Sequence, residues 1–143
     1  YGLKGLPLYM PDIRDPEHQQ FIEMIGPAAH LDTMINVVSH QGKRSMIVHG
    51  GYYTLFSKEL DNISQRLDAA LCVVNDRDEF AYCPTNFLHT PSGAFLLPEP
   101  IETVVAFLSD RYGKQNVETL QPLAHEFMPY GGLRCRTNEL PTL

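Results

Sequence analysis

The chain has 143 residues, of which 43% are hydrophobic and 20% are charged, and its formal net charge is -6. This size and composition are typical of a folded chain with an apolar core, so residues 1–143 are expected to form a single domain. The basic residues are scattered and the apolar stretches are short, which excludes a nucleic-acid surface and a membrane span from the expected functions. The three cysteines show no CxxC spacing, so a reduced, cytoplasmic setting is favoured over a disulfide framework or a zinc ribbon.

The first half of the chain predicts a helix, a hairpin, a second helix and a strand. Residues 15–26 indicate a helix, with Asp15 as its N-cap and Gly26 at its end. The β-prone runs 30–38 and 44–49 flank the step Gln41-Gly42, which suits a hairpin turn. An apolar stripe at helical spacing predicts an amphipathic helix over 54–70, before a short buried strand over 70–75.

The second half predicts the same kinds of element in the same order. Residues 80–84 suggest a partner strand, and the runs 86–90 and 94–98 flank a Pro-Ser-Gly turn. Residues 99–113 then indicate a helix that ends at Gly113, followed by a strand over 116–120. The order strand, strand, helix, strand therefore occurs about twice, which predicts a mixed α/β fold built from repeated ββαβ units.

Two short stretches carry side chains suited to chemistry. In "AAHLDTM", His30 and Asp32 lie two residues apart, so on a strand both side chains would point to one face. A histidine with a carboxylate on the same face can shuttle protons near neutral pH. A histidine at a strand end beside a solvated aspartate explains the same spacing. In "PYGGLRCRTNELP", Arg134 and Arg136 flank Cys135 and would favour its nucleophilic thiolate.

The alternative for Cys135 is a small residue on a frayed tail, although its polar, glycine-rich setting differs from that of a buried structural cysteine. Cys72 and Cys83 have the apolar neighbours of core or strand-end cysteines and are assigned no function.

Together these stretches resemble the guanidine-modifying enzyme superfamily, which includes arginine deiminases, amidinotransferases and protein-arginine deiminases. "HLDTM" is similar to its His-x-Asp strand motif, and "GGLRCRTNELP" is similar to its C-terminal cysteine motif. The two motifs occur in the family's order, about a hundred residues apart. The resemblance covers the chain from Ala28 onward and implies the pentein fold, an α/β-propeller of ββαβ units, here as a partial ring.

The resemblance implies a deiminase-type hydrolase that acts through a thiolate and a covalent amidino intermediate. Cys135 would attack the guanidinium carbon, His30 would transfer protons, and Asp32 would bind guanidinium N–H groups. Arg134, Arg136 and Asn138 are further candidates for substrate binding. The substrate would be an arginine-like small molecule or an arginine of a protein, and neither a cofactor nor a metal is expected.

The family places further acidic residues upstream of the His-x-Asp strand, and only 29 residues precede His30 here. Asp12 and Asp15 are the only upstream aspartates, and Asp15 is already explained as a helix cap. The favoured explanation is a missing N-terminal portion of a longer protein. A compact divergent member and a degenerate relative remain as alternatives, and an open ring edge would favour a homo-oligomer or a partner.

Other interpretations stay open beside the deiminase. A catalytically silent guanidino-binding or interaction domain would keep the fold without turnover, and an amidinotransferase would pass the amidino group to an amine. A cysteine hydrolase acting on acyl carbon would use the same Cys–His pair. His40 and His49 flank the expected hairpin and could meet as a metal pair, but no third ligand lies nearby in the sequence, so no metal site is predicted. Nothing in the spacing assigns a role to His89 or His125.

Overall fold

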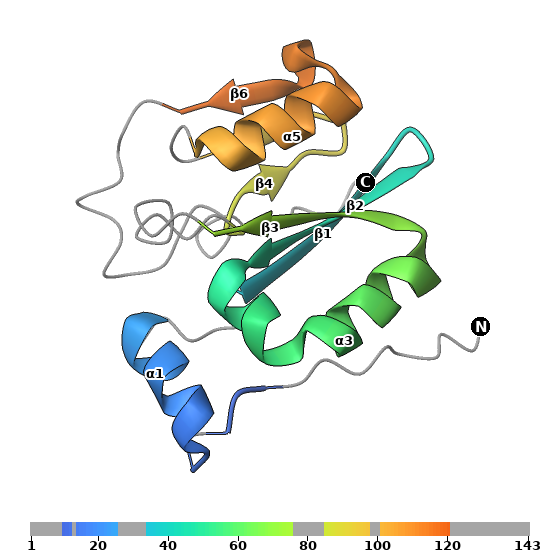
Figure 1. Cartoon of the computed structure of the whole chain (residues 1–143). Coiled ribbons are helices and arrows are strands. Elements are labelled where there is room, and N and C mark those ends of the chain that lie inside the picture. The colour runs from blue at the N-terminus through green and yellow to red at the C-terminus, as the bar shows by residue number, and fades with distance from the viewer. Residues whose placement is uncertain (1–9, 13, 26–33, 76–84, 98–100, 121–143) are drawn as a thin grey trace, which may run out of the picture.

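The computed structural model describes residues 10–12, 14–25, 34–75, 85–97 and 101–120 of the chain. Two three-stranded sheets and three α-helices make up the described part, so the predicted mixed α/β class is confirmed (Figure 1). The elements in chain order are α1 (Pro16–Ile25), β1 (Ile35–His40), β2 (Lys43–His49), α3 (Gly50–Leu67), β3 (Ala69–Val74), β4 (Leu88–His89), β5 (Phe95–Leu97), α5 (Glu102–Tyr112), the short 3-10 helix η2 (Lys114–Asn116) and β6 (Val117–Thr119).

Helix α1 begins where the sequence predicts it. The backbone N–H of Glu17 donates to Oδ1 of Asp15 at 2.9 Å, and the N–H groups of two following residues donate to the Asp15 carbonyl. Asp15 therefore caps the helix, and Pro16 stands where a missing N–H group costs nothing. The buried ring of Phe21 packs on Tyr52, which holds α1 against α3.

Strands β1 and β2 form a tight antiparallel hairpin. Ile35 lies opposite Val48, and His40 lies opposite Lys43. The two turn residues between them have positive φ, 50° at Gln41 and 75° at Gly42. A two-residue turn of this kind matches the right-handed twist of the strands, and glycine adopts the second position without strain. The predicted Gln41-Gly42 turn is confirmed.

Helix α3 returns the chain so that β3 lies parallel to β2, with His49 opposite Val74. The helix begins at Gly50, whereas the sequence predicted a start at residue 54, because the His49 side chain caps the earlier turn. Phe56 has non-helical dihedral angles (φ -129°, ψ 33°), so the helix is kinked there. Asp68 ends it in the left-handed conformation, and its N–H donates to carbonyls of the last turn.

The second sheet has the same connectivity as the first. Strand β4 is antiparallel to β5, with His89 opposite Phe95, and α5 leads to β6, which is parallel to β5. Gly113, with a φ of 95°, ends α5 as predicted, and its N–H donates to the Ser109 carbonyl. The order strand, strand, helix, strand is thus seen in both halves of the described chain. The additional strand predicted over 80–84 lies outside the described residues.

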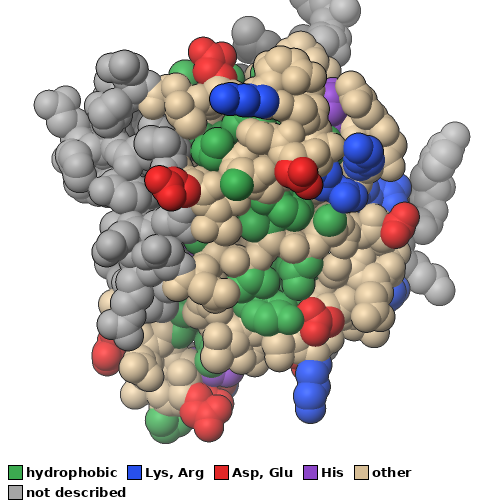
Figure 2. Space-filling model, turned by 45° about the horizontal axis from the view of Figure 1, so that its top comes forward, with side chains coloured by type: hydrophobic (Ala, Val, Ile, Leu, Met, Phe, Trp, Pro, Cys, Tyr) green, Lys and Arg blue, Asp and Glu red, His purple; other side chains and the backbone are tan. Residues whose placement is uncertain are grey.

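Basic side chains meet the carboxyl ends of α3 and α5. Arg44 donates from Nη1 to the Leu67 carbonyl at 2.9 Å, and Lys43 donates from Nζ to the Arg111 carbonyl at 3.0 Å. Arg111 in turn donates from Nη2 to the Arg44 carbonyl at 2.8 Å. In Figure 2, several basic side chains gather on one flank of the molecule, while acidic side chains are spread more widely. Positively charged side chains at the carboxyl ends of α3 and α5 are favourable because the helix dipole is negative at those ends.

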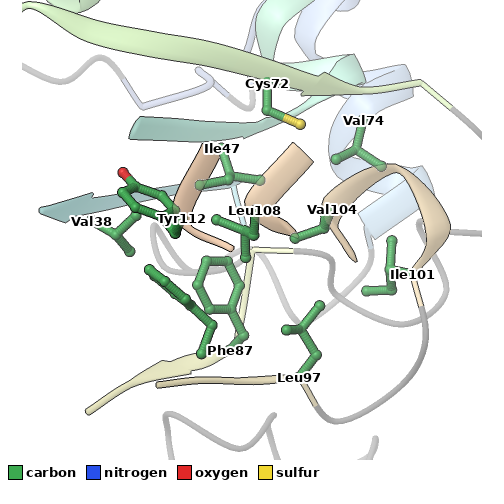
Figure 3. Close-up of a cluster of buried hydrophobic side chains, with 11 residues drawn as sticks. Val38, Ile47, Cys72, Val74, Phe87, Leu97, Ile101, Val104, Leu108 and Tyr112 are labelled. Carbon is green, nitrogen blue, oxygen red and sulfur yellow. The ribbon is translucent and has the colours of Figure 1, made fainter. Parts of the chain in front are cut away.

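The first sheet is covered on both faces. On one face, Met46 and Val48 pack with Tyr52 and Leu60 of α3. On the other face, alternate strand residues point toward α5 and the second sheet (Figure 3). The cluster on that second face consists of Val38, Ile47, Cys72, Val74, Phe87, Phe95, Leu97, Ile101, Val104, Leu108 and Tyr112. Burial of this apolar surface holds the two sheets together. It thereby fixes the relative positions of the strand ends, where a functional site could form.

Candidate functional site

The carboxyl ends of the parallel strands β2 and β3 lie at one edge of the first sheet, and this edge is the candidate site. His49 and Val74 are opposite each other at the ends of the two strands, and Asn75 follows directly. Strand β1 runs antiparallel to β2, so its first residue, Ile35, lies at the same edge. In open α/β sheets, ligands bind outside the carboxyl ends of parallel strands, where loops and helix starts supply polar groups.

Gly50 allows the chain to approach very closely at this edge. A Cβ atom at this position would lie 2.5 Å from Oδ1 of Asn75 and 2.6 Å from the Val74 carbonyl oxygen. Only glycine fits there without a shift of the backbone, because real Cβ contacts are longer than these distances. The start of α3 is therefore fixed directly against the end of β3, with the Asn75 amide beside it.

His49 is the most strongly perturbed titratable group of this edge. Its side chain is 2% exposed, its ring packs edge-on against Phe21, and its Nδ1 accepts the N–H of Gly51 at 3.1 Å. Burial lowers the pKa of His49 to about 4, so the imidazole is neutral at pH 7. Because Nδ1 accepts, the proton of the neutral ring is on Nε2. His49 thus acts as a fixed helix cap rather than as a proton shuttle near neutral pH.

Buried polar groups connect β1 to the segment that begins the second half. Nδ2 of Asn36 donates to the Thr85 carbonyl at 2.8 Å, with the Phe87 carbonyl at 3.5 Å. Asn36, Thr85 and Asn86 are each no more than 4% exposed. This buried hydrogen bond between two segments fixes their relative position. If the Asn36 amide were removed, the carbonyl group that accepts from it would stay buried without that hydrogen bond, which is costly.

The six predicted site residues lie outside the described residues, so the structure neither brings them together nor separates them. They are His30, Asp32, Arg134, Cys135, Arg136 and Asn138. The strand predicted over 30–38 is described from Ile35 onward. In sequence, Asp32 and His30 precede β1 by three and five residues.

The two upstream aspartates have local partners. Asp12 accepts Nε and Nη2 of Arg14 at 2.9 and 2.8 Å, and these side-chain bonds, with the backbone N–H of Arg14, hold the pKa of Asp12 below its usual value. Asp15 caps α1. Both carboxylates therefore have structural explanations, as the sequence already indicated for Asp15.

His40 and His49 do not face each other across the hairpin. The register places His40 opposite Lys43 beside the turn, whereas His49 ends β2 at the far end of the hairpin. The idea that they could meet as a metal pair is wrong, because a two-residue turn directly follows His40. Across the described ranges, no group of three or more histidine, cysteine, aspartate or glutamate side chains is placed to hold a metal ion.

Sequence reasoning missed the structural roles of His49 and Asn36. A signal for His49 was present, since a polar residue before Gly50-Gly51 at a strand-to-helix junction is a candidate N-cap. No local signal exists for Asn36, whose partner lies 49 residues away.

In the described part of the chain, no helix is both long and apolar enough to span a membrane. No family model, curated protein or solved structure matches the chain.

Proposed function

We propose that this chain is part of a guanidine-modifying hydrolase of the deiminase type, with Cys135 as the nucleophile. The observation that carries the proposal is the pair of motifs "HLDTM" and "GGLRCRTNELP", which occur in the order and at the separation of that superfamily. Each motif alone is a moderate signal, and their combination in one chain of 143 residues is a stronger one.

The connectivity of the described part supports the proposal. Each sheet consists of an antiparallel pair, a helical crossover and a third strand parallel to the second. This is the ββαβ unit that the resemblance implies, and two such units packed through one apolar cluster would be consecutive members of a pentein-type partial ring. Fold alone does not carry an activity, so the motifs remain the main argument.

The proposed reaction has two halves. The Cys135 thiolate forms a bond to the guanidinium carbon, and the C–N bond to the departing amine breaks as His30 gives that amine a proton. Water then loses a proton to His30 and attacks the amidino carbon, which releases the ureido product and regenerates the thiolate. Asp32 holds the planar cation in place through charge-assisted hydrogen bonds. The substrate is an arginine-like small molecule or an arginine residue of a protein.

The first test is affinity labelling with chloroacetamidine, a small cationic electrophile that resembles a guanidinium group. Peptide mass spectrometry should find the adduct on Cys135, faster than with the neutral analogue chloroacetamide. Cys72 is an internal control, because it is buried in the cluster between the two sheets and should react only when the protein unfolds.

Matched variants make this test specific. Asp32→Ala should remove the preference of Cys135 for the cationic reagent, whereas Asp110→Ala, which removes an exposed carboxylate from α5, should leave the preference intact. Equal labelling of all three cysteines, with no effect of reagent charge, would contradict the proposal.

Turnover assays then separate the reaction classes. A hydrolase releases ammonia or an amine together with a ureido product from arginine or a peptidyl-arginine substrate. An amidinotransferase needs an acceptor amine and forms a new guanidino compound instead. Specific labelling of Cys135 without either product would favour the silent guanidino-binding domain.

A further inference from the structure

Two histidines from different sheets meet at the junction between them. His40, the last residue of β1, and His89, the last residue of β4, have ring centroids 5.8 Å apart with an interplanar angle of 80°. The His89 ring is stacked on Phe95 at 4.5 Å, with an angle of 12° between the planes. The His40 ring also contacts Phe95 and Tyr112, with centroids 6.2 and 5.9 Å away. The two imidazoles therefore belong to an aromatic cluster that joins the units.

Close packing fixes the position of the His40 ring. A Cβ at Gly93 would collide with that ring, so the turn between β4 and β5 lies directly against it. The Tyr112 ring, which the His40 ring contacts, is itself held by a buried hydrogen bond of 2.6 Å between its hydroxyl and Ser45 Oγ. His40 cannot swing away without disturbing contacts with the second unit.

The surroundings contain no described acidic partner for a protonated imidazole. Nε2 of His89 is buried and, within the described residues, has no hydrogen-bond partner. Neither histidine forms an ion pair with a described carboxylate, since the two ion pairs found there involve Arg14 and His18.

Several charged or titratable groups lie on the elements around the two rings. The cations Lys43, Arg44 and Arg111 form hydrogen bonds that link the tip of the β1–β2 hairpin to the last turns of α3 and α5. The Cζ atom of Arg111 lies 5.9 Å from the centroid of the Tyr112 ring. The full set is Lys43, Arg44 and His49 on β2, Glu102, Asp110, Arg111 and Tyr112 on α5, Lys114 on η2 and Glu118 on β6, while β5 and the turn 90–94 contribute none; His49 and Glu102 lie at the opposite ends of their elements. Asp110 and Glu118 are exposed. The charged side chains that hydrogen bonds hold at the hairpin tip, Lys43, Arg44 and Arg111, are thus all positive.

We propose that His40 and His89 form a proton-sensitive contact between the two ββαβ units, which is stable only while both imidazoles are neutral. A proton on either ring places a positive charge beside the other ring and near the cations of the hairpin tip, with water partly excluded. A second proton would add direct repulsion between the rings. Acidification therefore weakens the junction between the sheets before it affects the apolar cluster under α3.

The electrostatics of His89 support this direction. Burial first, and then the charge of His40, lower the pKa of His89. A histidine with a lowered folded-state pKa binds fewer protons when folded than when unfolded. Its contribution to stability is complete above its unfolded value of about 6.5 and is lost as the pH falls toward the folded value.

The test combines histidine NMR titration with urea unfolding of the native chain and of His40→Gln, His89→Gln and the double variant. In His40→Gln, the titration midpoint of the His89 Cε1–H signal should move to higher pH, because the charge of His40, which lowers the pKa of His89, has been removed. Between about pH 7.5 and about pH 5.5, the urea concentration at the unfolding midpoint should fall by less in the double variant than in the native chain. Ser39→Ala, at an exposed position of β1 next to His40, is the control and should retain the native loss.

Two outcomes would overturn the proposal. One is a His89 midpoint that does not respond to His40→Gln, and the other is an acid-induced loss in the double variant as large as in the native chain. If the glutamine variants do not fold, His40→Phe and His89→Phe each keep an aromatic ring while removing its proton site, and the same two comparisons apply. At about pH 5.5, amide shifts should change at the hairpin tip and in β4 and β5, with α3 unaffected.

Discussion

Replacement of His49 by asparagine should make the protein less sensitive to acid without removing its helix cap. Burial lowers the pKa of His49 to about 4, from an ordinary value of 6.5. Between about pH 4 and pH 6.5, His49 therefore binds a proton in the unfolded chain but not in the folded chain. Stability is complete above about pH 6.5 and falls as the pH decreases toward about 4. At 1.36 kcal/mol for each pKa unit, the difference corresponds to at most about 3 kcal/mol.

Asparagine is suitable because its side-chain oxygen can accept the N–H of Gly51, as Nδ1 of His49 does, and it does not titrate in this range. Urea unfolding at about pH 7 and at about pH 4.5 should show a smaller acid-induced loss in His49→Asn than in the native chain. Asn62→Gln, at an exposed position of α3 that does not titrate, provides a control. The carboxylates contribute equally to the acid-induced loss of stability in all three proteins. The effect of His49 is therefore the difference between their losses. Equal losses in the native chain and His49→Asn would refute the reasoning.

Two further substitutions test close packing and a buried hydrogen bond. Gly50→Ala should destabilise the protein by about 1–3 kcal/mol in urea unfolding, because the new Cβ would meet Asn75 Oδ1 and the Val74 carbonyl. An unchanged midpoint would mean that α3 does not start as described. Ser45→Ala should cost about 1–3 kcal/mol, since it leaves the buried Tyr112 hydroxyl without that partner. Adding Tyr112→Phe should then cost less than it does in the native chain, and strictly additive losses in this double-mutant cycle would contradict a direct bond.

The sequence predicted those elements whose signals are local. The Gln41-Gly42 turn and the Asp15 cap were found because each depends on a few adjacent residues. The end of α5 at Gly113 was found for the same reason. The start of α3 was placed four residues late because Gly50-Gly51 discourages a helix by propensity. The cap from His49 and the contact of Gly50 with the end of β3 outweigh that cost.

The interactions between the halves could not be read from the sequence. The bond from Asn36 to the Thr85 carbonyl, and the contact of His40 with His89, each join residues 49 apart. Hydrophobic pattern shows which face of a strand is buried, but not which distant element covers it. For the same reason, His40 and His49 were considered as a pair although the hairpin register separates them.

Strand β1 is held to the second unit near both of its ends. Asn36 does so through a buried hydrogen bond, Val38 through the apolar cluster and His40 through the aromatic cluster. All three lie on one face of the strand, because alternate residues point the same way. A shift of one residue in register would turn all three away together, so this arrangement selects a single register. The face of β1 that carries these three residues is thus held largely by the second half of the chain, whereas Ile35 on the opposite face packs with residues of the first half. In the proposed enzyme, where "HLDTM" leads directly into β1, the packing of the two units would be a requirement for placing His30 and Asp32.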